Sequence, residues 1–179
     1  MLFRKLGPAA ERSMTLANLG RALLEEGDLK GAELALNESL SHARGRKSEP
    51  VTAFALNVLG RLAFQRGDVD GARSLLEDAL QSLADVRHTW HMAESLEDLA
   101  AVLGAQGEAA RAARLWGAAE ALREEIGAPV APAERSRYEA AVASARETRP
   151  VTAFESAWAE GRAMTPEAAI DYAVVRVDA

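Results

Sequence analysis

Hydrophobic and polar residues follow each other along this chain at the spacing of amphipathic helices, and the pattern returns every 40 residues. Four sets of positions show this period without a gap: Leu16, Leu56 and Leu96; Leu19, Leu59 and Leu99; Gly27, Gly67 and Gly107; Ala32, Ala72 and Ala112. A helical repeat of this length cannot bury its apolar face alone and needs neighbours of the same kind. The pattern therefore predicts three stacked units.

Turn residues divide each unit into two helices. A glycine is expected just after the first helix, where a left-handed backbone is favourable for glycine, at Gly27, Gly67 and Gly107. An acidic residue then follows near the positive end of the second helix, at Asp28, Asp68 and Glu108. Each unit is therefore predicted to be a helix–turn–helix.

Small residues indicate how the two helices of a unit approach each other. We expect close contact at Gly20, Gly60 and Ala100 on the first helix, and at Ala32, Ala72 and Ala112 on the second. Larger side chains are expected to fill the space that remains, at Leu36, Leu76 and Trp116.

The segments LANLGRALLEEGDLKGA from Leu16 and LNVLGRLAFQRGDVDGA from Leu56 resemble the tetratricopeptide repeat, and LEDLAAVLGAQGEAARA from Leu96 follows them more loosely. The period of 40 departs from the usual 34 of that family, and HEAT-type helix pairs of about 40 residues are the second interpretation. The Leu-Gly and Gly-Asp-x-x-x-Ala patterns favour the tetratricopeptide interpretation.

The predicted fold is all-α: a right-handed stack of antiparallel helix pairs, or α-solenoid, with three 40-residue repeats and C-terminal capping helices. We expect one domain over residues 1–179, with repeats at about 12–44, 51–85 and 90–126 and further helices over 133–175. The turn-rich segment from Gly127 to Pro132 separates the repeats from these last helices.

Charge and composition exclude several function classes. The net charge is −6 and no run of Lys or Arg marks one segment, so nucleic acid is not an expected direct partner. The chain has no cysteine, which removes disulfides, thiolate metal ligands and cysteine nucleophiles. No segment approaches the roughly 20 apolar residues that span a bilayer, so no membrane association is expected and the cytoplasm is the expected location.

The stretch from Arg111 to Val174 resembles the C-terminal helical tail of large bacterial ATP-binding regulators, the group that includes LuxR-type and cyclase-linked members. The resemblance is carried by RLWGAAEALR from Arg114, PAER from Pro132 and AWAEGR from Ala157. It implies a sensor or scaffold arm whose repeats bind an inducer or a partner and relieve inhibition of an ATPase domain, which belongs to the same or another chain. The sequence contains no phosphate loop and no recognisable DNA-binding helix-turn-helix motif, so it matches only part of such a regulator.

The first helix of each tetratricopeptide unit lines the concave face, and we expect partner-binding residues there. They are Ala17, Arg21, Leu24, Asn57, Arg61, Phe64, Glu97 and Ala101. Arg21 and Arg61 occupy equivalent positions, and two stacked guanidiniums can bind a carboxylate or an acidic peptide end. The alternative is a solvated helix face with ion pairs inside the chain, such as Arg21 with Glu25.

Other candidate chemistry is weak. His88 and His91 lie three residues apart but have no evident third ligand, so no metal and no cofactor are expected. Trp116 and Trp158 are interpreted as core residues, and Trp90 as a candidate pocket residue. No nucleophile elbow or zinc-protease motif is present, so the chain is not expected to be an enzyme.

The function predicted from these patterns is binding of a protein or peptide by a bacterial regulator. One alternative is a helical small-molecule receptor with a pocket near Trp90 and Arg61. The other is a structural oligomerisation arm, such as one that forms a homodimer through an uncapped end of the stack.

Overall fold

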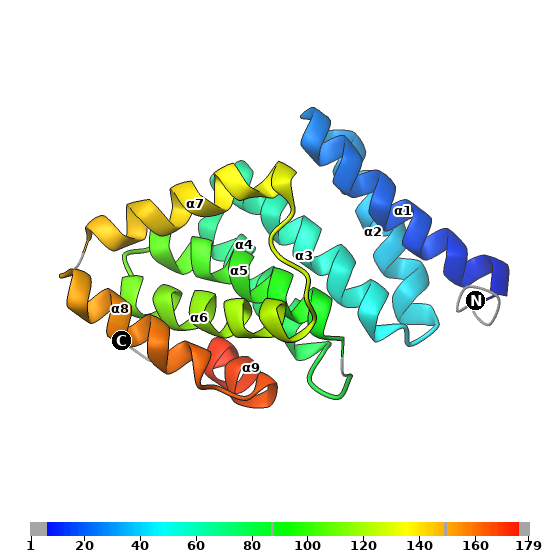
Figure 1. The fold of residues 1–179 in the computed structure, drawn as a ribbon. Helices are drawn as coiled ribbons and strands as arrows, with labels where there is room; N and C mark the ends of the chain where they lie inside the picture. The colour runs from blue at the N-terminus through cyan, green and yellow to red at the C-terminus, as the bar shows by residue number, and fades with distance from the viewer. Residues whose placement is uncertain (1–6, 87, 149, 176–179) are drawn as a thin grey trace. The chain divides into compact units, whose positions relative to one another are not determined.

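The computed structural model describes residues 7–86, 88–148 and 150–175, and these residues form nine α-helices and no strand (Figure 1). The helices are α1 (Gly7–Glu26), α2 (Leu29–Gly45), α3 (Glu49–Gln65), α4 (Val69–Gln81), α5 (Thr89–Ala105), α6 (Ala109–Glu125), α7 (Pro132–Glu147), α8 (Val151–Arg162) and α9 (Pro166–Val174). The chain divides into two compact units, Met1–Val86 and Arg87–Ala179, and each is considered by itself.

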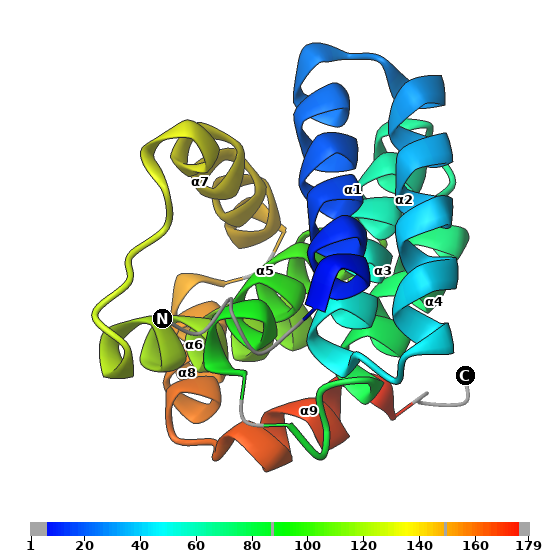
Figure 2. The ribbon, with the colours of Figure 1, turned by 90° about the vertical axis from the view of Figure 1, so that its right-hand side faces the viewer.

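The first unit consists of two antiparallel helix pairs. Helix α1 packs along α2, and α3 packs along α4; α3 also contacts α2 and α1 (Figure 2). Between the helices lies one apolar core: Ala17, Leu24, Ala32, Leu36, Leu40, Phe54, Ala55, Leu56, Val58, Leu59, Leu62 and Ala79. The repeat is not buried equally throughout, since Leu19 on α1 is 49% exposed whereas its equivalent Leu59 on α3 is 8% exposed.

Close packing inside each pair depends on a glycine of the first helix. A Cβ atom added to Gly20 would lie 2.5 Å from Cγ of Leu36, and one added to Gly60 would lie 2.7 Å from Cγ of Leu76. Real carbon atoms do not approach so closely, so any larger residue would force the paired leucine to move. The predicted contact between these glycines and leucines is confirmed.

The turns inside the pairs also follow the prediction. Gly27, Gly67 and Gly107 have φ values of 87°, 83° and 84°, the left-handed region in which glycine avoids the strain of a side chain. The Asp28 carboxylate accepts the backbone N–H of Gly31 at 2.9 Å, and Asp68 accepts that of Gly71 at 3.0 Å. Both aspartates therefore cap the helix that follows them.

The second unit is built on the antiparallel pair of α5 and α6. Helix α7 packs mainly on α5, α8 packs on α6, and α9 contacts both helices of the pair. Trp116 of α6 is completely buried, and its ring lies 6.4 Å from the ring centroids of Tyr138, Phe154 and Trp158. The interpretation of Trp116 as a core residue is confirmed, whereas Trp158 is only half-buried.

Two glycines let α6 and α8 cross at backbone distance. A side chain at Gly117 of α6 would overlap the carbonyl oxygen of Trp158, and one at Gly161 of α8 would overlap the carbonyl oxygen of Arg114. Backbone atoms cannot rotate away as flexible side chains do. The position of α8 on α6 therefore depends on both glycines.

The all-α class and the sequential antiparallel pairs are confirmed. The C-terminal helices occupy Pro132–Val174, and Thr165 caps the last one by accepting the N–H of Ala168 at 3.2 Å. The single domain over residues 1–179 stays a prediction. None of the helices in the described ranges has both the length and the hydropathy needed to cross a bilayer.

Candidate functional site

Some of the predicted partner-binding residues of the first unit are buried, and others are partly exposed. Ala17, Leu24 and Asn57 are at most 5% exposed, and the first two belong to the apolar core. Arg21, Arg61 and Phe64 are half-buried. The Arg21 guanidinium carbon lies 5.2 Å from the centroid of the Phe54 ring, which is a cation–π arrangement. Side chains that a partner could reach on this face are therefore the two arginines and Phe64.

In the second unit, the two predicted residues also differ. Ala101 is half-buried, whereas Glu97 is 9% exposed and forms an ion pair with Arg123. Arg123 Nε donates to Oε1 of Glu97 at 2.9 Å, and Nη2 donates to Oε2 at 2.7 Å. The pair joins α5 to α6 through two parallel hydrogen bonds, the strongest geometry available to these side chains.

Besides Glu97, two other groups contact the Arg123 guanidinium. Its carbon lies 5.0 Å from the centroid of the Trp90 ring, and Nη1 donates to the Ala128 carbonyl oxygen at 3.5 Å. Trp90, interpreted from the sequence as a candidate pocket residue, is 39% exposed and stacks on Arg123 from the start of α5. Arg123 therefore links α5, α6 and the connector that follows α6.

Burial and ion pairing have opposite effects on the pKa values of Glu97 and Arg123. Burial raises the pKa of the Glu97 carboxyl above its usual range, and the hydrogen bonds and charge of Arg123 limit that rise. Burial lowers the pKa of Arg123, but the hydrogen bonds that it donates to Glu97 and the negative charge of Glu97 outweigh that effect and raise the pKa overall. Both carboxylate oxygens accept bonds from the guanidinium, which is the geometry of an ionised pair.

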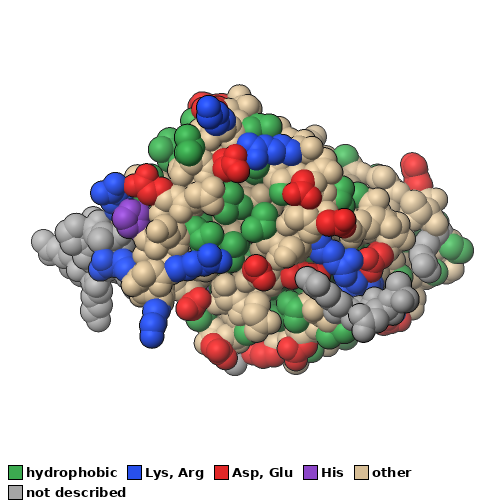
Figure 3. Space-filling view, turned by 180° about the vertical axis from the view of Figure 1, so that it is seen from behind, with side chains coloured by type: hydrophobic (Ala, Val, Ile, Leu, Met, Phe, Trp, Pro, Cys, Tyr) green, Lys and Arg blue, Asp and Glu red, His purple; other side chains and the backbone are tan. Residues whose placement is uncertain are grey.

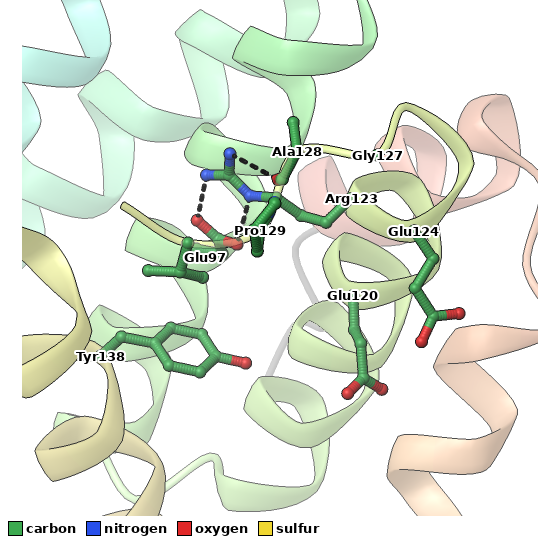
Figure 4. Close-up of a pocket in the computed structure, with 9 residues that line it drawn as sticks. Glu97, Glu120, Arg123, Glu124, Gly127, Ala128, Pro129 and Tyr138 are labelled. Carbon is green, nitrogen blue, oxygen red and sulfur yellow. Dashed lines mark hydrogen bonds and ion pairs between the residues drawn. The ribbon is translucent and has the colours of Figure 1, made fainter. Parts of the chain in front are cut away.

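Beside this pair lies a pocket of about 410 Å³, within the range of small-molecule sites (Figure 4). Its walls come from α5, α6, the connector between α6 and α7, and α7. The lining residues are Glu97, Glu120, Arg123, Glu124, Gly127, Ala128, Pro129, Val130 and Tyr138. Three carboxylates line the pocket and only one guanidinium, which Glu97 already occupies.

The two outer carboxylates are fixed by α8. Arg162 Nη1 donates to Oε2 of Glu120 at 2.5 Å, and Arg162 Nη2 donates to Oε2 of Glu124 at 2.7 Å. The indole N–H of Trp158 also donates to Oε2 of Glu120, at 2.7 Å. No described residue donates to the other oxygen, Oε1 of Glu120. Glu120 therefore retains one oxygen that can accept a further hydrogen bond.

Tyr138 supplies an aromatic wall opposite these carboxylates. Figure 4 shows its hydroxyl directed toward the side of the pocket that Glu120 lines. Burial, together with the negative charges of Glu97 and Glu120, raises the pKa of the Tyr138 hydroxyl well above its ordinary value. The hydroxyl therefore stays protonated at physiological pH, in a region of negative potential.

His88 and His91 pack against each other. Their rings are stacked with centroids 4.4 Å apart and planes inclined by 11°, and Nδ1 of His91 lies 3.3 Å from Oε2 of Glu94. Within the described ranges, no group of three or more His, Cys, Asp or Glu side chains is arranged to hold a metal ion.

On the face shown in Figure 3, Lys and Arg side chains form separate groups among Asp and Glu, without a continuous basic surface.

Arg123 was not predicted as a site residue, although the 40-residue register contains the signal. The equivalent positions in the earlier repeats are Ala43 and Leu83, both completely buried, and the equivalents of Glu97 are Ala17 and Asn57. An arginine at a position that is otherwise apolar must be buried with a partner, and Glu97 faces it across the helix pair. Comparing both helices of each repeat, rather than the first alone, identifies the pair.

Comparison with known proteins agrees with the repeat. A family model described as the tetratricopeptide repeat matches residues 52–84, which span most of α3, the turn and α4. Residues 52–84 therefore match one tetratricopeptide repeat. No match to a solved structure was found.

The chain is also similar in part to three curated proteins from Mycobacterium bovis and two strains of Mycobacterium tuberculosis, each named "Putative HTH-type transcriptional regulator". In each case 31% of residues are identical over 119 residues, which is 66% of this chain. The aligned part is only 14% of the length of these relatives. The similarity therefore concerns a small portion of much longer proteins.

Proposed function

We propose that this chain is a protein- or peptide-binding repeat module that serves as a sensor or scaffold arm of a bacterial transcriptional or signalling regulator. The observation that supports this most is the tetratricopeptide repeat at residues 52–84, because repeats of this kind present extended concave surfaces to partners. The partial similarity to proteins named as transcriptional regulators supports the regulatory setting. The proposed location is the cytoplasm, where such a regulator acts.

The proposed contact surface lies on the first unit. Arg21 of α1 and Arg61 of α3 occupy equivalent repeat positions, and both side chains are half-buried. The Phe54 ring beneath Arg21 limits the freedom of that guanidinium, which lowers the entropy lost when a partner binds. Two guanidiniums at equivalent positions, with that of Arg21 preorganised by Phe54, favour a carboxylate, so the proposed partner presents an acidic segment or a free C-terminal end.

A capture experiment tests this proposal. The chain, an Arg21→Ala/Arg61→Ala variant and an Arg44→Ala/Arg46→Ala control are immobilised and exposed to host lysate after circular dichroism has shown that all three fold. Arg44 and Arg46 are exposed and lie outside the predicted face, so the control removes equal charge. A partner retained by the chain and the control but lost by the first variant supports the proposal. Equal retention by all three would remove the arginines from the site.

The proposed module is not an enzyme. The polar groups brought together at Glu97 and Arg123 satisfy each other through two hydrogen bonds, and neither is left to act as an acid, base or nucleophile. A partner in the same regulator, such as an ATPase domain, would supply the chemistry.

The second candidate function is a small-molecule receptor. The pocket of about 410 Å³ in the second unit favours it, because pockets of this size commonly hold small ligands. The pocket residues lie on α5, α6, α7 and the connector, so this candidate does not depend on Arg21 or Arg61. Both functions can coexist in one sensor arm, since each uses a different unit.

A further inference from the structure

We propose that the pocket formed by α5, α6, α7 and the connector binds an organic cation, an ammonium or guanidinium group on a short apolar stem. The proposal rests on the second candidate function and adds the chemical class of the ligand. Three properties of the pocket carry it: the state of its charges, the nature of its walls and the acceptor left on Glu120.

The charges of the pocket favour a cation over an anion. Arg123 is the only cationic residue of the lining, and its guanidinium is already engaged by both oxygens of Glu97 and by the Trp90 ring. An anionic ligand would have to displace a buried carboxylate. Glu120 and Glu124 remain, and among the described residues they share one cationic partner, Arg162. A positive ligand therefore adds a missing counter-charge, whereas a negative ligand adds repulsion.

The acceptor that would receive the cation is Oε1 of Glu120. Trp158 and Arg162 both donate to Oε2 of that carboxylate, which fixes its orientation, and none of the described residues donates to Oε1. A hydrogen bond between an ammonium or guanidinium and a preorientated carboxylate is charge-assisted and roughly twice as strong as a neutral one. The ligand would gain this bond without the cost of ordering the acceptor.

The remaining walls suit a stem that is apolar and a head that is cationic. Pro129, Val130 and Ala128 present apolar surface along the connector, and the Tyr138 ring closes the opposite side. The Tyr138 hydroxyl is directed toward Glu120, and its oxygen can accept a hydrogen bond from a cationic head. A methylene stem against the connector and a charged head between Tyr138 and Glu120 would therefore satisfy both parts of the pocket.

This chemistry has two sources, a free metabolite and the side chain of a lysine or arginine on another protein. N-acetylarginine amide represents the side chain on a backbone, and agmatine represents the free amine. N-acetylcitrulline amide is the matched neutral probe, because a urea group replaces the guanidinium with almost no change in shape. Binding to the full ¹⁵N-labelled chain is followed by the amide resonances of Gly127 and Ala128, which line the pocket.

The expected result is a saturable shift of these resonances with at least one cationic probe and binding at least tenfold weaker for the citrulline probe. Glu120→Gln should weaken the cationic probe by about tenfold, because it removes a charge-assisted hydrogen bond of about 1.5 kcal/mol or more. Glu125→Gln is the matched control, since Glu125 is exposed on the same helix and does not line the pocket. It should leave the affinity unchanged.

The outcomes separate the class of ligand from the function itself. Binding of N-acetylarginine amide as tightly as agmatine indicates a side chain of a protein partner, and binding of agmatine alone indicates a free metabolite. Equal binding of the citrulline probe would overturn the charge preference and leave a neutral receptor. Absence of any shift at millimolar probe, or equal loss of affinity in both glutamate variants, would overturn the site.

Discussion

The second and third repeats place different side chains at equivalent positions of the same helix pair. Gly60 and Leu76 pack together in the α3–α4 pair, whereas Ala100 and Trp116 hold these positions in the α5–α6 pair. The larger Trp116 ring extends further and reaches Gly104, one turn after Ala100, where its Cη2 would lie 3.5 Å from an added Cβ. The helix pair therefore accommodates the Trp116 ring because a second small residue, Gly104, stands where the second repeat has Phe64.

A second difference between the two repeats is that the third contains a buried ion pair where the second has uncharged residues. The second repeat has Asn57 and Leu83 where the third has Glu97 and Arg123, and all four are buried. Buried ion pairs seldom improve stability over apolar residues of similar volume. The third repeat thus carries polarity that packing alone does not need, next to the pocket, which is why the pair is of functional interest.

The largest expected effect comes from breaking this pair on one side. Glu97→Asn, which introduces the residue of the second repeat, leaves the Arg123 charge buried and should lower the free energy of unfolding by about 3–5 kcal/mol. Unfolding in urea is followed by tryptophan fluorescence. The signal reports on the second unit, because Trp90, Trp116 and Trp158 all lie in Arg87–Ala179.

The double variant Glu97→Asn/Arg123→Leu completes the exchange between repeats. It should recover most of the lost stability, because no unpaired charge remains and leucine fills part of the volume. If the loss of unfolding free energy in the double variant equalled the sum of the losses in the two single variants, the two side chains would not be energetically coupled.

A smaller loss is expected when the aromatic centre is replaced by the aliphatic residue of the other repeats. Trp116→Leu leaves a cavity among Tyr138, Phe154 and Trp158, and should destabilise the second unit by about 3 kcal/mol in the same fluorescence assay. Leu76→Met in the second repeat is the control, because it nearly conserves volume and should cost less than about 1.5 kcal/mol by circular dichroism.

The crossing of α6 and α8 has no counterpart in the second repeat and can be tested separately. Gly117→Ala should cost about 2 kcal/mol, because its Cβ would overlap the carbonyl oxygen of Trp158 and push α8 away. Gly45→Ala at the end of α2 meets no atom within 4 Å of the added carbon and should be neutral or slightly stabilising. A stable Gly117→Ala chain with unchanged tryptophan fluorescence would show that α8 does not need this contact.

The smallest expected effect concerns the residues that precede the second helix of each repeat, Asp68 before α4 and Glu108 before α6. Asp68→Ala removes the hydrogen bond to the Gly71 N–H and should cost about 1 kcal/mol, measured by circular dichroism. Glu108, the equivalent residue before α6, makes no capping bond with its side chain and binds Arg111 Nη1 at 2.7 Å instead. Glu108→Ala should therefore change stability by only about 0.5 kcal/mol, and an equal loss in both variants would contradict this distinction.

Much of the local fold follows from the sequence because glycine and aspartate have few substitutes where they stand. The left-handed turns at Gly27, Gly67 and Gly107 and the caps at Asp28 and Asp68 are short-range features, and all five were predicted correctly. These residues determine where helices end without reference to the rest of the chain.

The candidate site is less accessible to the same reasoning because it depends on distant parts of the chain. Glu97 was placed on the concave face because it lies on the first helix of its repeat, yet Arg123 pairs with it from 26 residues away. The pocket also needs Tyr138 from α7, and the α8 residues Trp158 and Arg162 orient Glu120. Amphipathic periodicity does not specify how α7 and α8 pack on the α5–α6 pair.

The Glu97–Arg123 pair also constrains the order in which substitutions can accumulate. From an apolar pair such as Ala17 and Ala43, introducing either charged residue first leaves a buried charge without a partner, so that single step is strongly disfavoured. A neutral polar residue and a long apolar one, as at Asn57 and Leu83, form an intermediate without unpaired charge. The three repeats thus hold at equivalent positions an apolar pair, a neutral polar pair and an ion pair, and reaching the ion pair from either of the other two requires both charges to be introduced together.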